Sequence, residues 1–212
     1  ADYCTITADP DGEGDATYPE PRKVHIAYES VFGNAAPDYL QSEVLLEIGA
    51  RSLFEPTAKA KIKSLVSENS TIDTTFADVD IISAVPEKTF LEKVFLLHEL
   101  FTTDGCRTAN RKSRHLYDLM KMMDEPFARD AVHDDELWNT IHHHREVFTS
   151  IKDVDYTPDI RKRIVLLPPE EVLKVWQEDY KAMQESMIYR EQVTFEQLLS
   201  KIQELQARFR SI

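Results

Sequence analysis

The sequence predicts an α+β fold in which strands come first and helices follow. Up to Val85, short stretches alternate apolar and polar residues, as half-buried strands do. From Pro86 onward, apolar residues return at every third or fourth position, as on amphipathic helices. Hydrophobic residues form 42% of the 212 residues, which is enough for a core. We therefore expect a strand-containing part over residues 1–85 and a mainly helical domain over residues 86–212.

Strands and loops are expected in the first part. Residues 9–22 are rich in Asp, Glu, Gly and Pro and predict an acidic loop. Alternation of apolar and polar side chains predicts strands over residues 23–28, 42–50 and 76–85. Residues 58–66 fit either an edge strand with a lysine face or a short helix.

Helices are expected throughout the second part, and start signals mark most of them. A proline at the first helical position, an acidic N-cap and a capping box each satisfy or avoid the unpaired amides of a first turn. These signals and the apolar spacing predict helices from Pro86 through Phe101, over about residues 107–123, from Asp134 or Asp135 through Phe148, from Pro168-Pro169 through Met183, and from Thr194 with Gln197 through Phe209.

Composition excludes several classes of protein. The formal net charge of −13 argues against a protein that coats nucleic acid nonspecifically. The two cysteines, Cys4 and Cys106, form no zinc or disulfide pattern and suit a reducing compartment. No stretch is long and apolar enough to span a membrane, and no signal peptide is visible. We expect a cytoplasmic protein without a membrane partner.

Lys93 is the most unusual residue of the first predicted helix. It falls on the apolar side, beside Leu96 and Leu100, where an ammonium group must snorkel to water, pair with an anion or lose its charge. His98 lies on the same helix, and it fits either core packing or contact with a substrate.

Asp118 lies among basic residues on the second predicted helix. Arg107, Arg111 and Arg114 share its side of that helix. One interpretation is a solvated face with an Arg114–Asp118 pair at i,i+4 spacing. The other is a basic surface that faces an anionic ligand and holds one carboxylate within it.

Acidic residues that could bind a metal occur in the strands. Glu47 belongs to an otherwise apolar strand, so it marks either a cleft or a solvated sheet face. Asp78 and Asp80 form an Asp-x-Asp pair before apolar residues. Residues 142–144 are three consecutive histidines, which point in different directions on a helix and therefore do not converge on one ion.

Three motifs resemble those of the AbiEii/AbiGii-type nucleotidyltransferase toxins. They are PEKTFLEKVFLLHE at residues 86–99, RHLYDL at residues 114–119, and LPPE at residues 167–170 followed by Asp179-Tyr180. The resemblance extends from about Val24 to the C-terminus. It implies the remainder of a polymerase-β-like nucleotidyltransferase sheet, followed by a helical C-terminal domain. It also implies a role in toxin–antitoxin or phage-defence systems.

The resemblance assigns roles to particular residues. Lys93 would bind the nucleotide triphosphate and serve catalysis, and Asp118 would be catalytic. Arg114 and His98 would support the nucleotide, and Glu47 would be a metal ligand. The implied substrates and partners are an NTP, Mg²⁺, an RNA acceptor that is possibly tRNA, and a cognate antitoxin protein.

The chain departs from that family in one respect. The family's first motif, a Gly-Ser or Gly-Gly-Thr turn before an Asp-x-Asp strand, has no match ahead of these motifs. We therefore expect the chain to be the C-terminal portion of such a toxin, and inactive by itself because two metal ions require clustered carboxylates.

Two other functions remain open. One is a non-catalytic helical domain that binds an antitoxin or another protein, for which a lysine on an apolar helix side has no evident use. The other is a metal-dependent phosphohydrolase that uses Asp78 and Asp80, which predicts tight binding of a divalent metal.

Overall fold

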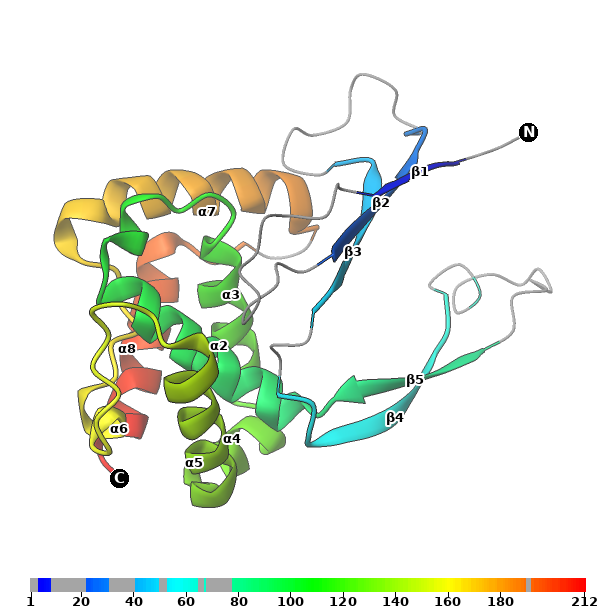
Figure 1. Ribbon diagram of the computed structural model, residues 1–212. Helices are drawn as coiled ribbons and strands as arrows, with labels where there is room; N and C mark the ends of the chain where they lie inside the picture. Colours follow the sequence, from blue (N-terminus) through cyan, green and yellow to red (C-terminus); the bar gives the residue numbers. More distant parts are fainter. Residues whose placement is uncertain are drawn as a thin grey trace.

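The protein has an α+β fold in which two small antiparallel sheets precede a helical body (Figure 1). The computed structural model describes residues 4–8, 22–30, 41–49, 53–64, 67, 78–189 and 192–212. The fold class predicted from the sequence is confirmed. The acidic loop expected over residues 9–22 lies almost wholly outside the described residues.

The first sheet has the strand order β1-β2-β3, built from β1 (Cys4–Ala8), β2 (Arg22–Tyr28) and β3 (Glu43–Ile48). Both pairings are antiparallel, and Ile26 lies opposite Ile6 on one side and Val44 on the other. β2 and β3 match the predicted strands, whereas β1 was not predicted because its pattern covers only five residues.

The second sheet pairs β4 (Thr57–Ile62) with β5 (Val79–Ala84), with Thr57 opposite Ala84. The ambiguous stretch from residue 58 is therefore a strand in its first half. Apolar side chains of both sheets remain exposed, including Ile48 at 63% and Ile82 at 59%. Sheets of two or three strands are only marginally stable without packing, so the described core must come from elsewhere.

The helices supply that core, which begins at Phe90 among the described residues. Helix α2 is central, because α3, α4 and α5 all pack against it (Figure 1). The helices are α2 (Pro86–Phe101), α3 (Ser113–Met122), α4 (Pro126–His133), α5 (Asp135–His144), α6 (Ile160–Arg163), α7 (Leu173–Met187) and α8 (Phe195–Arg210).

Local capping signals place several of these helices correctly. Helix α2 begins at Pro86. The side chain of Asp134 accepts a hydrogen bond from the amide of Leu137 at 2.9 Å and caps α5. Thr194 and Gln197 form the predicted capping box before α8.

The predicted helix over residues 107–123 is wrong in its first half. Residues 104–107 form a 3-10 turn, and α3 begins only at Ser113. Asn110 and Arg111 have φ values of 27° and 63°, which interrupt a right-handed helix. The arginines expected along one helix face are therefore divided between a turn, a loop and α3. The helix predicted to reach Phe148 also changes, because a π-helical turn, η3 (Arg145–Thr149), follows α5.

Candidate functional site

Lys93 of α2 and Asp118 of α3 meet at the edge of the helical core. The Nζ atom of Lys93 donates to Oδ2 of Asp118 at 2.8 Å. Their side chains are 22% and 40% exposed, so the pair lies at the rim and not within the core. Of the three possibilities for Lys93, the structure shows pairing with an anion, which comes from the neighbouring helix.

His115 is the third member of this cluster. Its Nδ1 atom lies 3.4 Å from Nζ of Lys93. Burial, followed by the charges of Lys93 and Arg114, lowers the pKa of His115 to about 4. The imidazole is therefore neutral at pH 7 and can accept a hydrogen bond from the ammonium group. Sequence reasoning missed His115, although it stands three positions before Asp118 and so shares its side of the helix.

Arg114 does not form the i,i+4 pair with Asp118 that belonged to one of the two interpretations of this helix. Arg114 is exposed on α3, while the carboxylate of Asp118 is bound by Lys93. Arg107 instead pairs with Asp104 at 2.8 Å in the preceding turn. The cation that balances Asp118 is thus Lys93, and Arg114 is available beside the cluster.

A pocket of about 380 Å³ adjoins the cluster along α2. This pocket was not predicted from the sequence, because its residues come from α2, from the residues around the start of α3, and from η3 and the residues after it. Its lining consists of Leu96, Glu99, Leu100, Thr103, Gly105, Lys112, His115, Arg145 and Ile151.

A buried ion pair supports one wall of this pocket. Glu99 is 5% exposed, and its Oε1 accepts from Nε of Arg145 at 2.9 Å and from the hydroxyl of Tyr156 at 2.7 Å. Nη2 of Arg145 bonds the other carboxylate oxygen. Burial and the hydrogen bond to Glu99 raise the pKa of Tyr156, so its hydroxyl stays protonated and donates. The guanidinium of Arg145 is thereby fixed in one orientation.

Asp179 of α7 anchors the start of α3. Its Oδ1 accepts from the amide of Arg111 at 2.6 Å, and its Oδ2 accepts from the amide of Ser113 at 3.0 Å and from the Ser113 hydroxyl. These bonds satisfy amides at the beginning of α3, as an N-cap does. Because α3 carries His115 and Asp118, Asp179 positions both.

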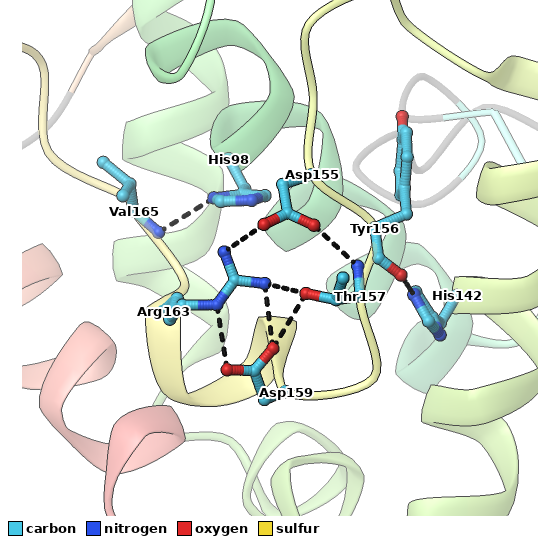
Figure 2. A network of polar contacts seen from close by, with 8 residues as sticks. All are labelled: His98, His142, Asp155, Tyr156, Thr157, Asp159, Arg163 and Val165. Atoms are coloured by element: carbon cyan, nitrogen blue, oxygen red, sulfur yellow. Dashed lines mark hydrogen bonds and ion pairs between the residues drawn. The ribbon is translucent and has the colours of Figure 1, made fainter.

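His98 lies in the core, where its imidazole faces the backbone of Val165 (Figure 2). It is 3% exposed, and its Nδ1 accepts a hydrogen bond from the amide of Val165 at 3.1 Å. Burial is the main cause that lowers the pKa of His98 to about 4. Beside it, Arg163 binds Asp155 and Asp159, which brace the loop that leads to Val165. Of the two interpretations of His98, these contacts support core packing.

The predicted metal ligands do not form a cluster. Glu47 lies on β3, where its Oε1 is 3.6 Å from Nζ of Lys23. Within the part of the chain that the structure describes, no group of three or more His, Cys, Asp or Glu residues could hold a metal ion. His142 contacts the carbonyl of Tyr156 at 2.8 Å. The described residues therefore do not fit a Mg²⁺ site, and they lend no support to a hydrolase centred on Asp80.

Comparison with known families identifies the chain. A family model for the nucleotidyl transferase AbiEii toxin of type IV toxin–antitoxin systems matches residues 2–201. The chain belongs to this family. No curated protein and no solved structure gives a match. Members of the AbiEii family are nucleotidyltransferase toxins that are paired with a cognate antitoxin. None of the helices in the described ranges is long and apolar enough to cross a membrane.

Proposed function

We propose that the Lys93–Asp118 cluster serves nucleotidyl transfer from an NTP to an RNA acceptor, with tRNA as the first candidate. The observation that carries the proposal is the 2.8 Å contact of Lys93 with Asp118, at the rim of the core and beside a neutral His115. An ammonium group and a carboxylate are the two groups that a triphosphate and an attacking hydroxyl require.

The two charges would change partners when the nucleotide binds. A phosphate oxygen would replace the carboxylate of Asp118 at the ammonium group of Lys93. The released carboxylate could then accept the proton of the acceptor hydroxyl. The hydroxyl oxygen forms a bond to the α-phosphorus, the bond between that phosphorus and the bridging oxygen breaks, and pyrophosphate leaves. Arg114, exposed beside the cluster, would add a second cation for the phosphates.

Mg²⁺ as the cofactor and a cognate antitoxin as the protein partner are also part of the proposal. Nucleotidyl transfer generally uses divalent metal ions to neutralise the reacting phosphates. Glu47 remains the proposed metal ligand. One carboxylate does not make such a site by itself.

The test is transfer of labelled nucleotide to total tRNA by the full gene product, with toxicity measured in parallel. Asp118→Asn and Lys93→Ala should abolish both. Asp130→Asn on α4 and Lys121→Ala on α3 are matched exposed controls and should retain both. Full transfer by the Asp118→Asn protein would contradict the proposal and favour the alternative of a non-catalytic interaction domain.

A further inference from the structure

The pocket beside Lys93 has an apolar floor that the core leaves open. Lys93, Leu96 and Leu100 follow one another at i, i+3 and i+7 on α2, so they lie on one side of the helix. Leu96 and Leu100 are only partly buried, whereas Leu97, on the core side, is fully buried. This side of α2 therefore presents two leucines to the pocket, beginning one helical turn after the lysine.

Residues from two other segments complete the lining of the pocket. His115 and Lys112 line the pocket from α3 and the residue before it. Arg145 and Ile151 line it from η3 and the residues that follow. The volume of about 380 Å³ falls in the range of roughly 300–1,000 Å³ that is typical of small-molecule sites.

The charge of the lining differs in sign from that of the whole chain. Two cations, Lys112 and Arg145, line the pocket with one carboxylate, Glu99, and that carboxylate is already bound by Arg145 and Tyr156. The chain as a whole carries −13. The pocket therefore suits a ligand with an apolar ring, hydrogen-bond acceptors at its edge and an anionic group nearby.

The π-helical turn gives independent support. π-helical turns are rare in proteins, but those that occur are frequently found at functional sites. Here the turn runs from Arg145 to Thr149, and the next residue, Ser150, has a left-handed backbone conformation immediately before Ile151. The irregular turn thus delivers two lining residues to the pocket, and the Glu99 ion pair holds one of them in a fixed orientation.

We propose that this pocket binds the base and ribose of the donor NTP, with the triphosphate extending to Lys93. The inference rests on the proposed function and adds to it the residues that hold the nucleoside. The base lies on Leu96 and Leu100, and donors on Arg145 and Lys112 face the acceptor atoms at its edge. The distance is suitable, because one helical turn of about 5 Å separates the leucine floor from the lysine.

The first test is a titration followed by NMR of leucine methyl groups in the 212-residue chain. Each of the four NTPs is added in turn, and inorganic tripolyphosphate is the probe without a nucleoside. At least one NTP should shift the methyl signals of Leu96 and Leu100 and give NOEs from these methyls to base protons. Tripolyphosphate should leave both methyl signals in place.

Variants separate the nucleoside contact from the phosphate contact. Leu100→Ser should weaken NTP binding about tenfold, the effect of losing one leucine contact, and leave the affinity for tripolyphosphate unchanged. Leu199→Ser is the control, since Leu199 is also a partly buried leucine but lies on α8. Lys112→Ala, with Lys174→Ala on α7 as its control, gives a second measurement should the leucine variant fail to fold.

Several results would overturn the inference. They are equal affinities for NTP and tripolyphosphate, no effect of either pocket variant, and leucine methyls that respond only to a short RNA. These readouts do not depend on turnover, so they separate the two proposals. If no NTP shifts the leucine methyl signals and the Asp118→Asn protein is inactive, only the proposed nucleoside pocket is refuted. If an NTP shifts the leucine methyl signals but the Asp118→Asn protein is fully active, only the proposed role of Asp118 is refuted.

Discussion

The Lys93–Asp118 pair should matter greatly for transfer and little for folding. The two side chains are 22% and 40% exposed, so water screens their attraction despite the 2.8 Å contact. Exposed ion pairs typically contribute about 0.2–1 kcal/mol. Domains of this size have a free energy of unfolding of about 5–15 kcal/mol. The coupling between the two residues should therefore stay below about 1 kcal/mol in a double-mutant cycle.

The cycle uses the same full gene product as the transfer assay for its parent, together with Lys93→Ala, Asp118→Asn and the double variant. Urea denaturation gives the four free energies of unfolding, and the transfer assay is run on the same preparations. Each single variant should lose transfer while remaining within about 1 kcal/mol of the parent. A coupling above about 2 kcal/mol would refute the reasoning, since the pair would then be a structural ion pair, and loss of transfer would only report a damaged fold.

Other regions give further expectations. Asp179→Ala should lower the free energy of unfolding by about 2 kcal/mol and slow transfer, because α3 loses its anchor; Glu185→Ala on the same helix is the control. Glu99→Gln should cost about 3 kcal/mol in urea denaturation, because it leaves Arg145 buried without its counter-ion. The pKa of His98 is lowered to about 4, so stability should be full above pH 6.5 and decline between pH 6.5 and 4, by on the order of 3 kcal/mol; in His98→Gln this decline should be smaller. The 212-residue chain alone should incorporate no labelled nucleotide into RNA with Mg²⁺, and incorporation would show that the described carboxylates suffice.

Local signals explain the parts of the fold that the sequence predicted well. Pro86 at a first helical position and the Thr194–Gln197 capping box act within one turn of the residues they define. The same holds for β3, where alternation over six residues marks the strand without reference to its partner. Such elements can be read from a short window because the groups that stabilise them lie inside it.

The start of α3 could not be predicted in this way. No glycine or proline between Arg107 and Ser113 indicates a break. The break is stabilised by Asp179, which lies 66 residues beyond Ser113 and accepts the amides that begin the helix. Positive φ at Asn110 and Arg111 persists because those bonds offset its cost. A contact between distant parts of the chain decides this boundary.

The ion pair of the candidate site could not be predicted from the sequence for the same reason, because it joins two distant parts of the chain. The helical wheel left Lys93 to snorkel to water, pair with an anion or lose its charge, because a wheel gives a direction relative to one helix and not the identity of the facing residue. Arg114 was the nearer partner for Asp118 in sequence, yet exposed i,i+4 pairs contribute only about 0.3–0.5 kcal/mol, and the crossing of α2 over α3 offers Lys93 instead. The identity of the cation that pairs with Asp118 matters for the proposed chemistry. A carboxylate paired with Arg114 would keep its partner when a triphosphate reached Lys93, whereas one paired with Lys93 must give up that partner to the phosphate. Nucleotide binding and the release of Asp118 as a proton acceptor would therefore be one event.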